Sequence, residues 1–148
     1  QFACLLHQSG ARLFSLIEDA SLQKSPALFN LTASAYWNDH YLFEKQTVNH
    51  VKSLGKDGER LLIINGLAPF MFYYGTVQGQ PAICEGVVEY LGSTRGEQNS
   101  TISHWAEAGF PVENAMQTQA LLHLKQAYCD KKRCLECRVG ARLLGNAR

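Results

Sequence analysis

The sequence has little net charge, because fourteen basic and thirteen acidic side chains leave a formal charge of +1 at neutral pH. No overall electrostatic field therefore directs the chain toward nucleic acid or an anionic membrane. Charged residues make up only 18% of its 148 residues, whereas apolar residues make up 46%. This composition excludes intrinsic disorder and is typical of a globular protein long enough to bury a substantial core.

The sequence also lacks an apolar run long enough to cross a bilayer. Its longest run, residues 61–74, has fourteen residues, whereas a membrane-spanning helix needs about 20. We therefore expect no membrane partner, and we interpret the run as the buried central helix of the fold. Pro69 lies inside this helix and removes one backbone hydrogen bond, so we expect a kink near Asn65 and Gly66.

Long stretches of strand-like alternation are absent, and so are internal repeats. Helix signals are common instead. In the first part of the chain, apolar faces predict short helices at residues 2–6 and 13–17. Ser25 followed by Pro26 predicts the start of a third helix, because serine caps helices and proline is favoured at the first helical position.

Caps and stops are also frequent later in the chain. The residues expected to begin helices are Asp57, Pro81, Asn99 or Ser100, and Asn114 in a capping box with Gln117, and those expected to end them are Gly75, Gly92 and Gly109. These signals predict an all-α fold, an irregular helical bundle around the central kinked helix. We expect one helical domain over residues 1–148 and, since the sequence starts with Gln1 rather than Met, a fragment of a longer protein.

An aromatic stretch at residues 35–43 follows neither helical nor strand spacing, and we interpret it as an ordered connection packed on the core. Asp39 and His40 within it suggest an acid/base or ligand pair. The alternative is that His40 makes a structural hydrogen bond inside an aromatic cluster, where an amphipathic ring is at home.

Cysteines are few, at five in the whole chain, yet Cys129, Cys134 and Cys137 lie within nine residues as C-x4-C-x2-C. An odd, clustered set argues against a secreted disulfide scaffold and favours a reducing, cytoplasmic setting. The spacing occurs in structural zinc sites and also matches the first three ligands of a plant-type [2Fe–2S] pattern. We therefore predict a C-terminal cysteine knot, a cluster of thiols, that binds zinc or an iron–sulfur cluster.

Either cofactor needs a fourth ligand, and no side chain after Cys137 can supply it. The predicted metal site consists of Cys84, Cys129, Cys134 and Cys137, with His123 and Cys4 as alternatives to Cys84 and with no catalytic residue assigned. Basic residues at 131–142 would offset the thiolate charge or contact the phosphates of a nucleic acid.

Two other functions compete with the metal site. Cys134 and Cys137 form a C-x-x-C pair that suggests a thiol redox switch, although no surrounding βαβ pattern supports a thioredoxin-like fold. Alternatively, the thiols are reduced and buried, and the chain is a purely structural interaction module.

Several motifs carry a family resemblance. They are Tyr36-Trp37 with His40-Tyr41 and Phe43, Leu62 to Asn65 with Pro69 and Tyr74-Gly75, Glu97 to Asn99, Trp105, Gln119 to Leu121, and Leu124-Lys125 through Tyr128-Cys129, Lys132, Cys134-Leu135, Cys137 and Gly140. On these residues the chain resembles the C-terminal part of a bacterial family described as domain of unknown function 2851. Family members resemble restriction-type nucleases in their N-terminal half. The resemblance implies that this chain is a helical accessory domain for that half, and it favours an iron–sulfur cluster over zinc.

Overall fold

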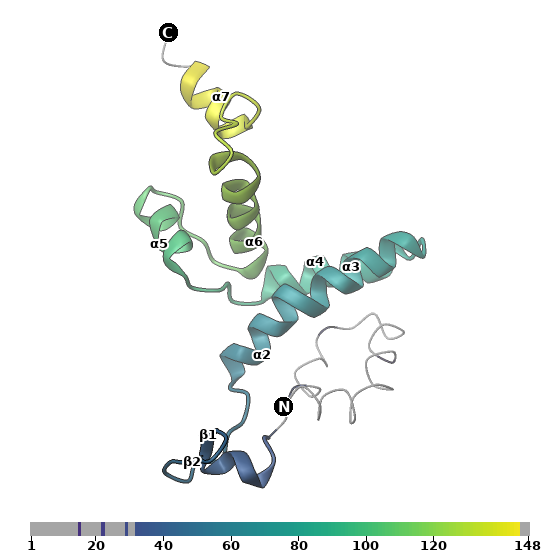
Figure 1. Cartoon of the computed structure of the whole chain (residues 1–148). Coiled ribbons are helices and arrows are strands. Elements are labelled where there is room, and N and C mark those ends of the chain that lie inside the picture. Colours follow the sequence, from purple (N-terminus) through teal and green to yellow (C-terminus); the bar gives the residue numbers. More distant parts are fainter. Residues whose placement is uncertain (1–14, 16–21, 23–28, 30–31, 146–148) are drawn as a thin grey trace. The chain divides into compact units, whose positions relative to one another are not determined.

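A computed structural model of the chain describes Ser15, Leu22, Phe29 and residues 32–145 (Figure 1). Apart from Ser15, the helices expected at residues 2–6 and 13–17, and the start of the one expected at Ser25 and Pro26, lie outside the described residues.

Contacts divide the chain into two compact units, residues 1–90 and 91–148. The elements of the first unit are η2 (Ala35–Asn38), β1 (His40–Leu42), β2 (Lys45–Gln46), α2 (Lys56–Leu62), η3 (Ile63–Leu67), α3 (Ala68–Val77) and most of α4 (Pro81–Ser93). Those of the second unit are α5 (Ser100–Glu107), α6 (Ala115–Leu124), η4 (Lys125–Cys129) and α7 (Arg138–Gly145). The described residues are mainly helical, as predicted. The single domain over residues 1–148 stays a prediction.

One element departs from the all-α prediction. Strands β1 and β2 pair antiparallel, with His40 opposite Gln46 and Leu42 opposite Lys45, and Glu44 turns the chain between them with a φ of 62°. Strands this short carry too few residues for an alternating pattern to be recognised. The aromatic stretch is ordered, but it does not pack on the core as expected, because Phe43 is 76% exposed.

The expected central helix is present as α2, η3 and α3, which follow one another without a break as one continuous helix (Figure 1). The disturbance expected near Pro69 takes the form of a π-helical turn, in which the Ala68 N–H donates to the Ile63 carbonyl five residues back. Pro69 has no N–H to donate, and its ring crowds the carbonyl four residues earlier, that of Asn65, which lies inside the widened turn. No helix among the described residues combines the length and apolar character that crossing a bilayer requires.

The central helix is buried along one face only, so the prediction of a buried central helix is correct for that face alone. The buried side chains are those of Ile63, Ile64, Leu67, Ala68 and Met71, whereas Leu61, Leu62, Phe70, Phe72 and Tyr73 are exposed. An apolar sequence sets what can be buried, but the neighbouring elements decide which face is covered.

Three predicted helix boundaries are also wrong, one of them at Gly92, which lies inside α4 because that helix continues to Ser93. Helix α2 begins at Lys56 after Gly55, so Asp57 lies inside the first turn, where its carboxylate is 2.9 Å from the Arg60 guanidinium. Gly75 does not end α3, which continues to Val77. A Cβ on Gly75 would lie 3.0 Å from the Ile83 Cβ, so this glycine lets α4 approach α3 closely.

In the second unit the predicted caps are confirmed. The Asn99 side chain accepts a hydrogen bond from the Ile102 N–H at 3.0 Å, and the Asn114 side chain accepts one from the Gln117 N–H at 3.0 Å. Gly109 follows α5 with a φ of 88°, a conformation that favours glycine.

Helix α6 is buried on the face that carries Ala115 and Thr118. Met116 is 43% exposed, whereas Ala115 and Thr118 are fully buried. The reason is the segment before α5: the Ala115 N–H donates to the Thr94 carbonyl at 2.8 Å, and Gly96 lies against the Thr118 side chain. A loop that covers the helix therefore selects its buried face.

Candidate functional site

The cysteine segment, residues 129–137, connects η4 to α7. Cys129 is the last residue of η4, a π-helical turn in which the Asp130 N–H donates to the Lys125 carbonyl at 2.9 Å. Cys129 and Cys134 are exposed, Cys137 is buried, and all three thiols are free.

The three cysteines line one cavity of about 170 Å³, which we call the thiol pocket. Its other walls are formed by Trp105, Phe110, Leu124, Tyr128, Val139 and Gly140. The indole and phenyl rings of Trp105 and Phe110 meet edge to face, with centroids 5.5 Å apart. The second unit thus brings three of the four predicted ligands to one apolar cavity.

The turn from Cys134 to Cys137 is tied to the start of α7. The Cys137 N–H donates to the Cys134 carbonyl at 3.3 Å, and the Ala141 N–H donates to the Cys137 carbonyl at 2.7 Å. A Cβ on Gly140 would lie 2.3 Å from the Cys134 carbonyl oxygen, so only glycine fits there without displacing the backbone.

Charged side chains surround the cysteine segment. Arg133 and Glu136 form an ion pair across the turn; the hydrogen bond between them lowers the pKa of Glu136 and raises the pKa of Arg133. The Lys125 ammonium is 2.7 Å from the Asp130 carboxylate. Within the part of the chain that the structure describes, Lys131, Lys132 and Arg138 form no ion pair.

The thiols do not form a finished metal centre. Among the described residues, no group of three or more His, Cys, Asp or Glu side chains is arranged to hold a metal ion. The zinc or iron–sulfur site therefore stays a prediction.

Cys84, the predicted fourth ligand, lies on α4 in the first unit. Its thiol donates to the Phe72 carbonyl at 3.4 Å and is 3.6 Å from the Thr76 hydroxyl, so it contributes to the contact between α3 and α4. Its role as a ligand stays a prediction. His123 is exposed on α6, and Cys4 lies outside the described residues.

A second cavity, of about 240 Å³, was not anticipated from the sequence; we call it the histidine pocket. It is lined by Thr101, His104, Trp105, Lys125 and Cys129. His104 lies on α5, far from the cysteines in the sequence. The sequence therefore gave no indication that His104 and Cys129 line the same cavity.

The Asp39 and His40 pair lies in the first unit. The His40 Nδ1 is 2.7 Å from the Asp39 carboxylate and 2.9 Å from the Tyr36 carbonyl oxygen, and its ring stacks on Tyr36 with centroids 4.2 Å apart. The structure therefore agrees with both hypotheses from the sequence. His40 is paired with the Asp39 carboxylate, and it also lies in an aromatic cluster.

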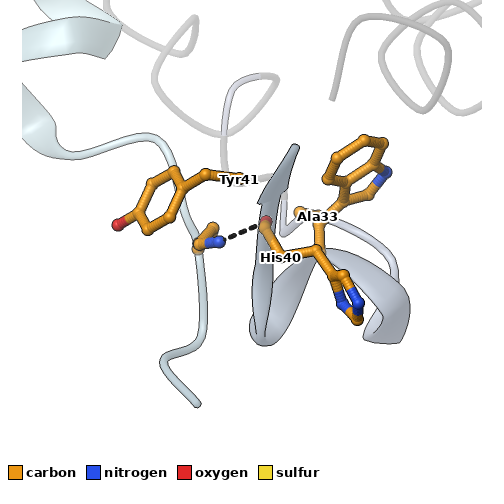
Figure 2. A pocket seen from close by; sticks show the side chains of 5 residues that line it. Ala33, His40 and Tyr41 are labelled. Atoms are coloured by element: carbon orange, nitrogen blue, oxygen red, sulfur yellow. Dashed lines mark hydrogen bonds between the residues drawn. The ribbon is translucent and has the colours of Figure 1, made fainter. Parts of the chain in front are cut away.

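A cavity of about 250 Å³ adjoins this pair and is lined by Ala33, Trp37, His40, Tyr41 and Lys52 (Figure 2). The Lys52 ammonium donates to the His40 carbonyl at 2.5 Å and lies 3.5 Å from the centre of the Tyr41 ring. Figure 2 shows the His40 imidazole and the Tyr41 ring on opposite sides of β1. Lys52 thus contacts two residues of β1 and stabilises the hairpin, a role that the sequence did not indicate.

No curated protein and no solved structure matches the chain. One family does, and its match extends over residues 1–100, which include the hairpin, the central helix and the Asn99 cap and end before the cysteine segment. The match covers more than half of the chain, and it agrees with the resemblance in the motifs between Tyr36 and Asn99. The chain therefore belongs to the family described as "Protein of unknown function (DUF2851)".

Proposed function

We propose that residues 91–148 form a helical module that binds zinc or an iron–sulfur cluster through the thiolates of Cys129, Cys134 and Cys137. The module acts as an accessory to a nuclease-like domain elsewhere in the protein, as the family resemblance implies. The observation that carries the metal proposal is that all three thiols line one cavity. Thiolates gathered in one place are typical ligands of zinc and of iron–sulfur clusters.

The surroundings of the cavity support this proposal. Its apolar walls would keep water from a bound cluster or ion, which protects thiolate ligands from exchange. Lys131, Lys132 and Arg138, which lack a carboxylate partner among the described residues, would offset the negative charge of the thiolates. Gly140 fixes the Cys134 carbonyl against α7 and so holds the Cys134 to Cys137 turn in place.

The test is the metal content of protein purified without oxygen. We expect near-stoichiometric zinc by elemental analysis, or iron with the visible absorbance of an iron–sulfur cluster. The variant Cys134→Ser should lose most of the metal. Leu135→Ser is the matched control, because Leu135 is 81% exposed in the same turn and does not line the cavity. Wild-type protein with neither zinc nor iron would refute the proposal.

A second candidate function is a thiol switch between Cys134 and Cys137. It is favoured by one observation: the turn joins an exposed thiol to a buried one, as an attacking and a resolving thiol would be arranged. A disulfide such as oxidised glutathione would accept the two electrons and two protons. Mass spectrometry of metal-free protein after this treatment should then find a bond between the two cysteines, and its absence would eliminate the switch.

A further inference from the structure

The thiol pocket and the histidine pocket share two lining residues, Trp105 and Cys129. Cys129 therefore faces both cavities, with Cys134 and Cys137 around one and His104 around the other. All four side chains belong to the second unit. The structure thus places the His104 imidazole and the three thiols around two cavities that share Trp105 and Cys129.

His104 is well placed to act as a ligand. Helix α5 is anchored by the Asn99 cap at its start and by the buried side chain of Ile102. The neighbouring residue, Trp105, packs into the wall of the thiol pocket. Among the described residues, the His104 imidazole has no hydrogen-bond or ion-pair partner, while its carbonyl accepts from the Ala108 N–H at 3.0 Å.

His123, which the sequence analysis named as an alternative ligand, also belongs to the second unit but lines neither cavity. The Cys84 thiol instead donates a hydrogen bond to the Phe72 carbonyl in the first unit. We infer that His104 is the fourth ligand of the proposed site, which makes it a Cys3His centre formed by Cys129, Cys134, Cys137 and His104. This inference rests on the proposed function.

The donor set indicates the class of metal. Three thiolates with one neutral imidazole form a common tetrahedral zinc site, and the imidazole leaves the centre less negative than a fourth thiolate would. Because the described side chains form no metal-holding group, the proposed centre requires side chains to move when the metal binds, those of His104 and Cys129 among them. Both are exposed, so their rotation does not disturb buried packing.

The test uses cobalt(II) as a spectroscopic substitute for zinc, titrated into the metal-free full chain under anaerobic conditions. Sulfur-to-cobalt charge-transfer absorption reports the thiolates, and the visible bands report tetrahedral coordination. We expect His104→Ala to weaken cobalt binding at least about tenfold, since loss of second-shell partners alone weakens metal sites 10–100-fold. The thiolate absorption at saturation should persist. His104→Cys should restore tight binding and increase the charge-transfer intensity.

The controls are His123→Ala, an exposed histidine on α6, and Cys84→Ser. Both should bind cobalt as the wild type does. If Cys84→Ser weakens binding while His104→Ala does not, the fourth ligand is Cys84 and the inference is wrong. If Cys134→Ser abolishes binding and neither fourth-ligand variant changes it, the three-thiol proposal stands while His104 is excluded. Wild-type protein without thiolate-to-cobalt absorption would overturn both the three-thiol proposal and the assignment of His104 as the fourth ligand.

Discussion

Gly140 lies directly against the backbone of Cys134, and a Cβ at this glycine would be 2.3 Å from the Cys134 carbonyl oxygen and 3.1 Å from its Cα. The third residue of α7 therefore sets the position of the second cysteine of the cluster. Backbone cannot yield as a flexible side chain can, so this contact restricts the site to glycine.

We expect Gly140→Ala to separate α7 from the cysteine turn at a cost of about 1–3 kcal/mol, as for other overpacked sites. Hydrogen exchange of the Ala141 N–H, which bonds to the Cys137 carbonyl at 2.7 Å, should become faster. Gly145→Ala in the same helix is the matched control, because nothing lies within 4 Å of its added Cβ. Equal exchange in the two variants would contradict the contact.

Gly96 has a similar role between the loop and α6. A Cβ there would lie 2.4 Å from the Thr118 Cγ2 and 2.9 Å from the Asn114 carbonyl oxygen, and Thr118 is fully buried. Gly96→Ala should lower the free energy of unfolding in urea by about 1–3 kcal/mol. Gly92→Ala, which meets nothing within 4 Å, should not destabilise the protein. A reversed order of the two stabilities would show that the loop does not cover α6.

The helix caps allow a third prediction. Asn99→Ala should destabilise the protein by about 0.5–2 kcal/mol, because the Ile102 N–H loses its acceptor. Ser100→Ala should have little effect, since Ser100 is the first residue of α5 and Asn99 is its cap. Thermal unfolding of the two variants measures the difference, and an equal loss in both would mean that the cap is shared.

The ion pair in the cysteine turn predicts a pH dependence. Arg133 donates to the Glu136 carboxylate and lowers its pKa below the usual 4.5. Because the folded-state pKa is the lower one, the contribution of the pair to stability is complete above the unfolded-state pKa. It is lost as the pH falls through the folded-state pKa.

An NMR titration of the Glu136 side chain should therefore show a pKa below its ordinary value. Arg133→Gln should return it to that value. Lys131→Gln, which removes a neighbouring charge that has no ion pair in the described part of the chain, should change it less. A Glu136 pKa that is insensitive to Arg133→Gln would contradict the pair.

Local signals explain what the sequence predicted correctly. The caps at Asn99 and Asn114 and the turn at Gly109 depend on atoms within a few residues, so the local pattern determines them. The disturbance before Pro69 is of the same kind, because the missing N–H is a property of one residue.

Features that depend on distant residues were missed. The sequence does not show which face of the central helix is covered, or that Gly96 fits against Thr118, twenty-two residues later. Gly75 was taken as a helix stop, although it serves the close approach of α4. His104 precedes Cys129 by twenty-five residues and has no motif of its own, so only the fold could show the two to be neighbours.

The π-helical turn η4 has a consequence for how the cluster tolerates insertions and deletions. Its bond from the Asp130 N–H to the Lys125 carbonyl spans one residue more than an α-helical turn does. Removing a single residue between Lys125 and Cys129 would let this turn close as a regular α-helical turn, and Cys129 would keep nearly its present direction, because the wide turn holds one extra residue within about one revolution. We therefore expect the cysteine cluster to tolerate a one-residue deletion in η4 better than one in a regular α-helical stretch, where the deletion would rotate every later side chain by about 100°.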